Sequence, residues 1–330
     1  MCWLNNKWPI WAASFLLSAG IARADVTLLL EEPYGDFGKM EPTGHAAIYF
    51  SRICADTPVS LRRCNPDEQG VVLSRYHRVG GYDWIAIPLI AYLYAVDRAD
   101  QVPPWVSREM VASLRDSYRR EHLEDIAPDE SDDRTPHGDW TQMVGEAYDR
   151  TIYTFGIETT ESQDDELIRA LNSESNRTRF HLLYRNCADF VREVIDSYYP
   201  KAIRRNFTSD LGIMTPKQAA KGLLRYSKKH PDLQFSSYVI AQVPGTVPRS
   251  SAVRGVLESV IKTKKYVLPL APLAVLYPAV GGGLAYAWME SSHFDPRQVA
   301  DARGSLQPKV VVSELRSNGR AGPASVLPAD

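Results

Sequence analysis

The chain has 330 residues, of which 44% are hydrophobic and 24% charged, and its formal net charge is -2. These values are ordinary for a folded protein and exclude a largely disordered chain. A net charge this close to zero lacks the positive field that nucleic-acid binding requires, so we expect no nucleic-acid partner. The length is enough to bury a substantial core, and we expect one larger domain, or one domain with a tail.

The first 24 residues have the composition of a secretory signal peptide. Lys7 precedes an apolar run over residues 8–19, and the small residues Ala22 and Ala24 predict cleavage before Asp25. An uncleaved membrane anchor is the alternative, although the run is shorter than the ~20 residues that a span needs. Either interpretation predicts an exported protein, which in a bacterial cell is periplasmic, either free or attached to the membrane.

Three short strands are predicted after the leader. Residues 26–30, 44–50 and 70–77 are enriched in β-branched and aromatic side chains. The segment that joins the second and third strands contains two cysteines on either side of a turn-rich stretch. A hairpin in this segment, clipped near its tip by a disulfide, is the simplest interpretation.

The cysteines themselves support this pairing. Cys54 and Cys64 are close in sequence, and an exported protein resides where disulfides persist. Two free thiols are the alternative, because the Cα separation that a disulfide requires cannot be read from sequence. Cys2 lies in the predicted leader, so Cys187 is left as the unpaired thiol and is flagged as reactive.

The middle of the chain has mainly helical periodicity. Ser107 is a predicted N-cap, with Met110 and Leu114 at helical spacing behind it. An acidic run at residues 128–133 predicts a solvated connector. The predicted helices cover residues 84–96, 107–121, 140–155 and 164–171.

A strand-like segment, residues 179–184, leads directly into a predicted amphipathic helix. The apolar residues Phe190, Val191 and Val194 lie on one face of that helix, whose first turn includes Cys187 or lies just beyond it. A further helix is predicted to begin at Thr215-Pro216, since proline is favoured at the first helical position. A last strand is predicted at residues 235–243.

The C-terminal third contains an apolar segment that begins at Tyr266 and ends at Trp288 and has no charged residue. Its length is that of a membrane span, but three prolines and three consecutive glycines disfavour a regular helix. The preceding lysines would lie on the exported side, against the positive-inside bias. We therefore keep two interpretations, contact with a membrane and a buried apolar hairpin, and we expect a flexible tail after Pro296.

Cys187 is the leading candidate for a catalytic nucleophile. A helix start stabilises a thiolate through its unpaired backbone N–H groups, which can also bind an oxyanion. His45, at the start of an apolar strand, is suited to act as general base and acid. The alternatives are a small buried cysteine in the core and a structural histidine.

Two short motifs then point to a family. Gly44-His45-Ala46-Ala47-Ile48-Tyr49 and Asn186-Cys187-Ala188-Asp189-Phe190-Val191 resemble the histidine strand and the cysteine helix of circularly permuted NlpC-type hydrolases, which include the lecithin:retinol acyltransferase-like proteins. As in that group, the histidine precedes the cysteine. The resemblance implies an α+β, papain-like fold over residues 25–245, with a small antiparallel sheet packed on the nucleophile helix.

The resemblance also implies a third polar residue that orients the histidine ring. We take His77 as the first candidate, and Ser74 and Tyr76 as alternatives that a shift in strand register would favour. The chain departs from the family in a helical insertion at about residues 82–175, and residues 246–330 form the apolar segment and tail. No metal-ligand spacing, phosphate-binding loop or cofactor motif is present.

These features predict an exported thiol hydrolase that cleaves an acyl bond. A cell-envelope peptide amide is the expected substrate, and a lipid acyl group is the alternative if residues 266–288 meet a membrane. A binding protein of the envelope that keeps the fold without catalysis is the rival hypothesis.

Overall fold

The computed structural model describes residues 25–35, 43–130, 136–177, 179–208, 210–262, 272, 276–301 and 305–306. The predicted leader therefore lies outside the described residues. Seven strands in the described part form one sheet with the order β6-β5-β2-β1-β7-β8-β9. The strands are β1 (Val26–Glu31), β2 (His45–Phe50), β5 (Val71–Ser74), β6 (Ile85–Pro88), β7 (Ile152–Ile157), β8 (Ser236–Ile240) and β9 (Ser305–Leu306).

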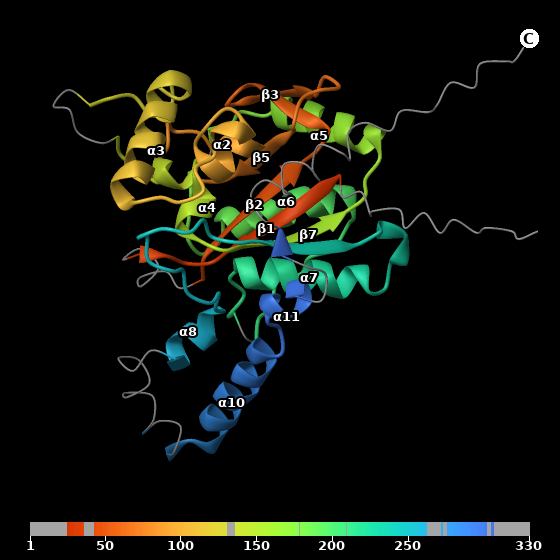
Figure 1. The fold of residues 1–330 in the computed structure, drawn as a ribbon. Coiled ribbons are helices and arrows are strands. Elements are labelled where there is room, and N and C mark those ends of the chain that lie inside the picture. The colour runs from red at the N-terminus through yellow and green to blue at the C-terminus, as the bar shows by residue number, and fades with distance from the viewer. Residues whose placement is uncertain are drawn as a thin grey trace, which may run out of the picture.

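All neighbouring strands of this sheet are antiparallel except β8 and β9, which are parallel. The helices lie on both sides of the sheet, as Figure 1 shows. They are α2 (Leu89–Tyr94), α3 (Arg108–His122), α4 (Glu146–Asp149), α5 (Glu161–Ser173), α6 (Cys187–Tyr198), α7 (Pro216–Ser227), α8 (Val256–Lys262), α10 (Pro278–Ser292) and α11 (Pro296–Asp301), with 3-10 turns at Ala99–Gln101, Trp140–Gln142 and Pro231–Leu233.

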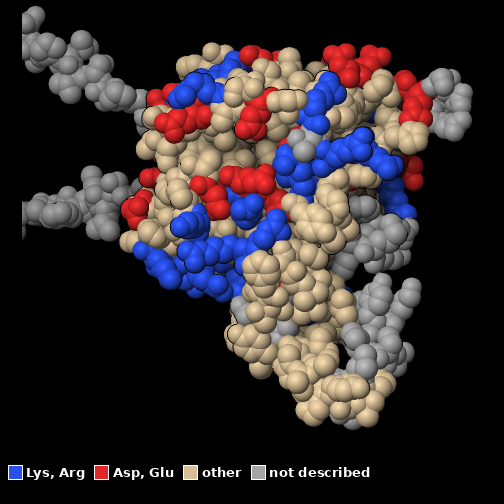
Figure 2. Space-filling model, turned by 180° about the vertical axis from the view of Figure 1, so that it is seen from behind, with Lys and Arg blue, Asp and Glu red and all other residues tan. Residues whose placement is uncertain are grey.

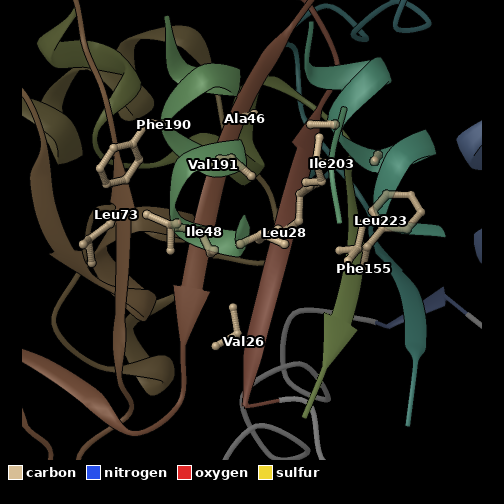
Figure 3. Packing of buried hydrophobic residues seen from close by; sticks show 14 of the residues in the cluster. Val26, Leu28, Ala46, Ile48, Leu73, Phe155, Phe190, Val191, Ile203 and Leu223 are labelled. Carbon is tan, nitrogen blue, oxygen red and sulfur yellow. The ribbon is translucent and has the colours of Figure 1, made fainter. Parts of the chain in front are cut away.

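Alternation along the strands divides the interior into two cores. Ala46 and Ile48 of β2 belong to the first core, where they meet α6 and α7. Figure 3 shows Val191 of α6 over these strands. Ala47 and Tyr49 point the other way, into the second core, which α2, α3 and α4 complete. The sheet is thus buried on both faces near its centre, and its strands read as nearly continuous apolar runs.

Several helices begin where the sequence predicts, because their start signals are local. The side chains of Ser107 and Thr215 accept hydrogen bonds from backbone N–H groups at the starts of α3 and α7. Thr160 and Gln163 form a capping box at the start of α5. The predicted mixed α and β composition and the antiparallel sheet are confirmed.

Two helix predictions are wrong in the same way. The sequence predicts a helix over residues 140–155, but β7 begins at Ile152 and lies in the sheet between β1 and β8. Ile85–Pro88 is likewise a strand, paired with β5, and α2 follows it. The apolar residues of both segments fit the spacing of a helix as well as that of a strand. Strand partners that are distant in sequence decide between the two structures. Residues 82–175 therefore supply two strands of the main sheet as well as helices.

The third wrong prediction is the strand at residues 179–184. His181 and Arg185 form an isolated bridge across a tight turn, and the intervening side chains of Leu182 and Tyr184 are exposed. Among the described residues no strand pairs with this segment. A turn here delivers the chain directly to the start of α6.

The predicted disulfide is confirmed. Cys54 and Cys64 are bonded, with Cα atoms 4.9 Å apart. They belong to a separate two-stranded sheet of β3 (Ile53–Thr57) and β4 (Ser60–Arg63), which extends the connection between β2 and β5. Pairing of Cys54 with Arg62 puts the disulfide near the open end of this hairpin rather than at its tip.

The C-terminal region is only partly covered by the description. In residues 276–301, α10 projects from the body of the molecule (Figure 1) and α11 returns to it. Arg297 of α11 forms an ion pair with Glu32 at 2.8 Å, and β9 pairs with β8. The start of the expected flexible tail is therefore ordered by contacts with the sheet. No described helix is long and apolar enough to span a membrane.

Candidate active site

Cys187 is the first residue of α6, and its position is set by a network of local hydrogen bonds. Asn186 caps the helix, since its side-chain oxygen accepts from the Asp189 N–H at 2.9 Å. The Asn186 amide group also donates to the carbonyls of Leu182 and Met214, at 2.8 Å and 3.0 Å. Three segments are thereby joined at the residue before Cys187, whose side chain is 7% exposed.

Arg75 fixes the helix start to the sheet. Its guanidinium group makes two hydrogen bonds to Asp83, at 2.8 Å and 2.9 Å, and one of 3.3 Å to the carbonyl of Asn186. It also lies 5.3 Å from the ring of Phe190. Arg185 binds Asp83 from the other side at 2.8 Å. An arginine that directly follows β5 therefore connects the sheet to the turn that carries Cys187.

His45 and Cys187 lie at the same end of the sheet. Helix α6 packs along β2, and the ring of Tyr198 near the end of α6 lies 6.4 Å from that of Phe50 at the end of β2. At the other end, Ser74 is bonded to the His45 ring, and the next residue, Arg75, donates to the carbonyl of Asn186, which precedes Cys187. Both starting residues therefore lie at this end of the sheet.

Side chains alternate between the two faces of β2, so the His45 side chain lies on the face that borders the second core. Cys187 belongs to the first core. Tyr76 lies close to both residues. Its ring stacks on the His45 ring with centroids 5.4 Å apart. Burial is the main cause that raises the pKa of Tyr76 well above its usual value, and the ionisable groups of Glu31, Glu146 and Cys187 raise it further. The Tyr76 hydroxyl is buried and has no hydrogen-bond partner in the described part of the chain.

The residue bonded to the His45 ring is Ser74, one of the two alternatives to His77. Its hydroxyl lies 3.0 Å from Nε2 of His45 and donates to the carbonyl of Ala46 at 2.7 Å. A hydroxyl has one proton, so Ser74 must accept from Nε2–H. The neutral ring then carries its proton on Nε2, and Nδ1 is the basic nitrogen.

The structure does not bring His77 to His45. The His77 ring lies edge-on to Phe180, with centroids 5.5 Å apart, and its carbonyl accepts from the backbone of Asp139 at 3.0 Å. The chain leaves β5 after Ser74, so His77 is no longer part of the strand that faces β2. Register thus selects Ser74 as the neighbour of the ring.

Burial keeps the His45 ring neutral. Desolvation lowers the pKa of His45 well below its usual value, and the positive charge of Arg150 lowers it further. A neutral imidazole can accept a proton, which an imidazolium cannot.

Behind His45 lies a buried charged cluster that sequence reasoning missed. Glu31 is the register partner of His45 on β1, and Arg150 binds Glu31 at 3.2 Å and Glu146 at 2.8 Å. The Tyr92 hydroxyl donates to Glu31. Burial raises the pKa of Glu31, and it raises the pKa of Glu146 to about 8. At neutral pH the two carboxyl groups therefore retain a proton, although the positive charges of Arg150 and of Arg115, which is 3.9 Å from Glu146, lie beside them.

The only sequence signals for these groups are charged residues at the ends of apolar runs, such as Glu31 at the end of β1 and Arg75 directly after β5. Solvent-exposed strand ends have the same composition. No protein-family model, curated protein or solved structure matches this chain.

Proposed function

We propose that the protein is an exported thiol hydrolase that cleaves an acyl bond, with Cys187 as nucleophile and His45 as general base. One observation carries the proposal: a cysteine outside the disulfide begins a capped helix that packs along β2, and β2 starts with a neutral histidine whose ring is held by Ser74. A helix start favours the thiolate, and an oriented neutral imidazole can accept its proton.

In the proposed reaction, Nδ1 of His45 takes the proton from Sγ of Cys187 and the thiolate attacks the acyl carbon. Proton transfer requires the two atoms to come within hydrogen-bond reach at the end of the sheet. The backbone N–H groups at the start of α6, apart from that of Asp189, which the Asn186 side chain already caps, are placed to bind the developing oxyanion. His45 then protonates the leaving group, and water hydrolyses the thioester.

Tyr76 supplies a further donor in this proposal. Its hydroxyl is buried and without a partner among the described residues, and it is within electrostatic range of Cys187. The high pKa of Tyr76 keeps this hydroxyl protonated at all physiological pH values. It is therefore suited to donate to the carbonyl oxygen of a bound acyl group. Ser74 acts through His45 and is a positioning residue.

A cell-envelope peptide amide is the first substrate class to test. A lipid acyl ester is the second, and the exposed apolar surface of α10 favours it, since lipid substrates are presented at membrane surfaces. Both classes require the same cysteine and histidine, so the nucleophile can be tested before the substrate is known.

The test is labelling of the purified protein with a thiol-reactive acyl probe, with the modified peptide identified by mass spectrometry. We expect the wild type to be labelled at Cys187 and Cys187→Ser to lose that label. His45→Ala should lower the labelling rate by about a hundredfold, since general-base assistance contributes factors of this size. His181→Ala is the matched control, because His181 is an exposed histidine close in sequence to Cys187. Equal rates for His45→Ala and the control would favour the non-catalytic binding protein.

A further inference from the structure

Helix α10 presents an apolar surface to solvent on most of its circumference. Residues 278–289 contain no charged side chain. Leu276 is 71% exposed, Tyr286 54% and Trp288 44%. The exposed large apolar side chains of this region are Leu276, Tyr277, Val280, Tyr286, Trp288 and Met289. The described part of residues 266–288 is thus not the buried hairpin that was one interpretation of the sequence.

An apolar helix with this exposure is not stable as a water-facing element of a soluble surface. On the described chain α8 packs against α10 and leaves these side chains uncovered. Figure 1 shows α10 projecting away from the sheet. The projection places the apolar side chains at an extremity of the molecule, where they can enter a lipid phase.

Basic side chains gather at the end of α7, the helix that lies on the side of the sheet from which α10 projects (Figure 1). Helix α7 and the residues that follow it end in Arg225, Lys228 and Lys229, all exposed. Lys217, at the other end of α7, forms a buried ion pair of 2.7 Å with Glu258, which ties α7 to α8. Figure 2 shows Lys and Arg side chains concentrated on the body beside the base of the uncharged projection.

We propose that α10 and the basic end of α7 together form a docking surface for an anionic lipid bilayer. The apolar and aromatic side chains enter the acyl boundary, and Arg225, Lys228 and Lys229 face lipid phosphates. Tyr and Trp are the residues that favour the membrane interface. At 15 residues α10 is ~22 Å long, which is less than the ~30 Å hydrocarbon core. It therefore enters the interface and does not cross the bilayer.

Charge complementarity favours an anionic bilayer over a second copy of the chain as the partner of this surface. Two copies that meet through α10 would bring their basic α7 ends toward each other, and like charges oppose such a contact. An anionic surface satisfies both the apolar helix and the basic helix end. This proposal does not depend on the reaction at Cys187.

The test is flotation of the full chain with vesicles of phosphatidylcholine alone and of phosphatidylcholine with phosphatidylglycerol. We expect binding to the anionic vesicles that weakens with salt. Trp288→Glu should lose binding, while Trp105→Glu, a change at an exposed tryptophan elsewhere, should keep it. Arg225→Glu should weaken binding by at least about fivefold, whereas Arg169→Glu on α5 should not.

Circular dichroism and thermal unfolding establish that each variant is folded, which is expected because these side chains are exposed. The proposal is overturned if the wild type fails to bind anionic vesicles, or if Trp288→Glu and Trp105→Glu bind equally. It is also overturned if sedimentation shows that Trp288→Glu abolishes a dimer while the wild type ignores vesicles, since a second copy then covers α10. Failure of the labelling experiment at Cys187 would leave all these outcomes unchanged.

Discussion

The buried pair Glu31 and Glu146 makes the stability of the protein depend on pH in an unusual direction. Burial raises the pKa of Glu146 from its ordinary 4.5 to about 8. In the unfolded chain this carboxyl group loses its proton near pH 4.5, whereas in the folded protein it keeps the proton to about pH 8. Because the folded pKa is the higher one, the proton-linked stability is fully present below pH 4.5 and is lost as the pH rises to 8.

The size of the effect follows from the two values. Each pH unit between 4.5 and 8 lowers the free energy of unfolding by about 1.4 kcal/mol through this group alone, which amounts to at most about 5 kcal/mol over the interval. Glu146→Gln places a neutral amide where the protonated carboxyl group stands. The variant should therefore lack this part of the pH dependence.

Urea unfolding followed by tryptophan fluorescence would measure the free energy of unfolding of both proteins at pH 5.5, 6.5 and 7.5, in steps of ~1 pH unit within this interval. We expect the wild type to lose stability relative to Glu146→Gln as the pH rises, because the titrating groups outside the Glu31–Glu146 pair cancel in the comparison. Glu124→Gln, at an exposed position in the loop after α3, is the matched control and should parallel the wild type. The same pH slope in wild type and Glu146→Gln would refute a raised pKa at this site.

Three further predictions concern the framework of the site. Arg75→Met removes two hydrogen bonds to Asp83 and should destabilise the fold by about 3 kcal/mol, measured by urea unfolding; a loss below about 1 kcal/mol would mean that Arg75 does not fix α6. Replacing Cys54 and Cys64 by serine should cost about 2–3 kcal/mol because the closed loop is short, and an unchanged melting temperature would argue against the bond. Gly44→Ala places a Cβ 2.1 Å from a backbone oxygen of β1 at a φ of +76°, so a loss of at least about 2 kcal/mol is expected, and a neutral result in thermal unfolding would contradict this geometry.

Local sequence was sufficient wherever a short segment carries its own signal. Caps such as Ser107 and Thr215 act on backbone groups within one turn, so the starts of α3 and α7 could be predicted. The apolar spacing behind Asn186-Cys187 likewise defined α6. The disulfide followed from two cysteines ten residues apart, although its place near the open end of the hairpin did not.

Segments whose partners are distant in sequence could not be assigned in this way. β7 reads equally well as a helix, and it is a strand because β1 and β8 supply hydrogen bonds on both of its edges. The same holds for β6, which pairs with β5. The apolar periodicity is a property of one segment, whereas a strand is stabilised by the neighbouring strands with which it pairs.

The sequence alone indicated that Cys187 lies outside the disulfide, at a helix start, and that His45 begins an apolar strand. Only the tertiary structure decided that Ser74, and not His77, holds the ring, because the choice depends on where β5 ends relative to β2. It also decided that Glu31, Glu146 and Arg150 lie behind His45. Their pKa values and the neutral state of the histidine arise from burial, and burial is a property of the packed fold rather than of any segment.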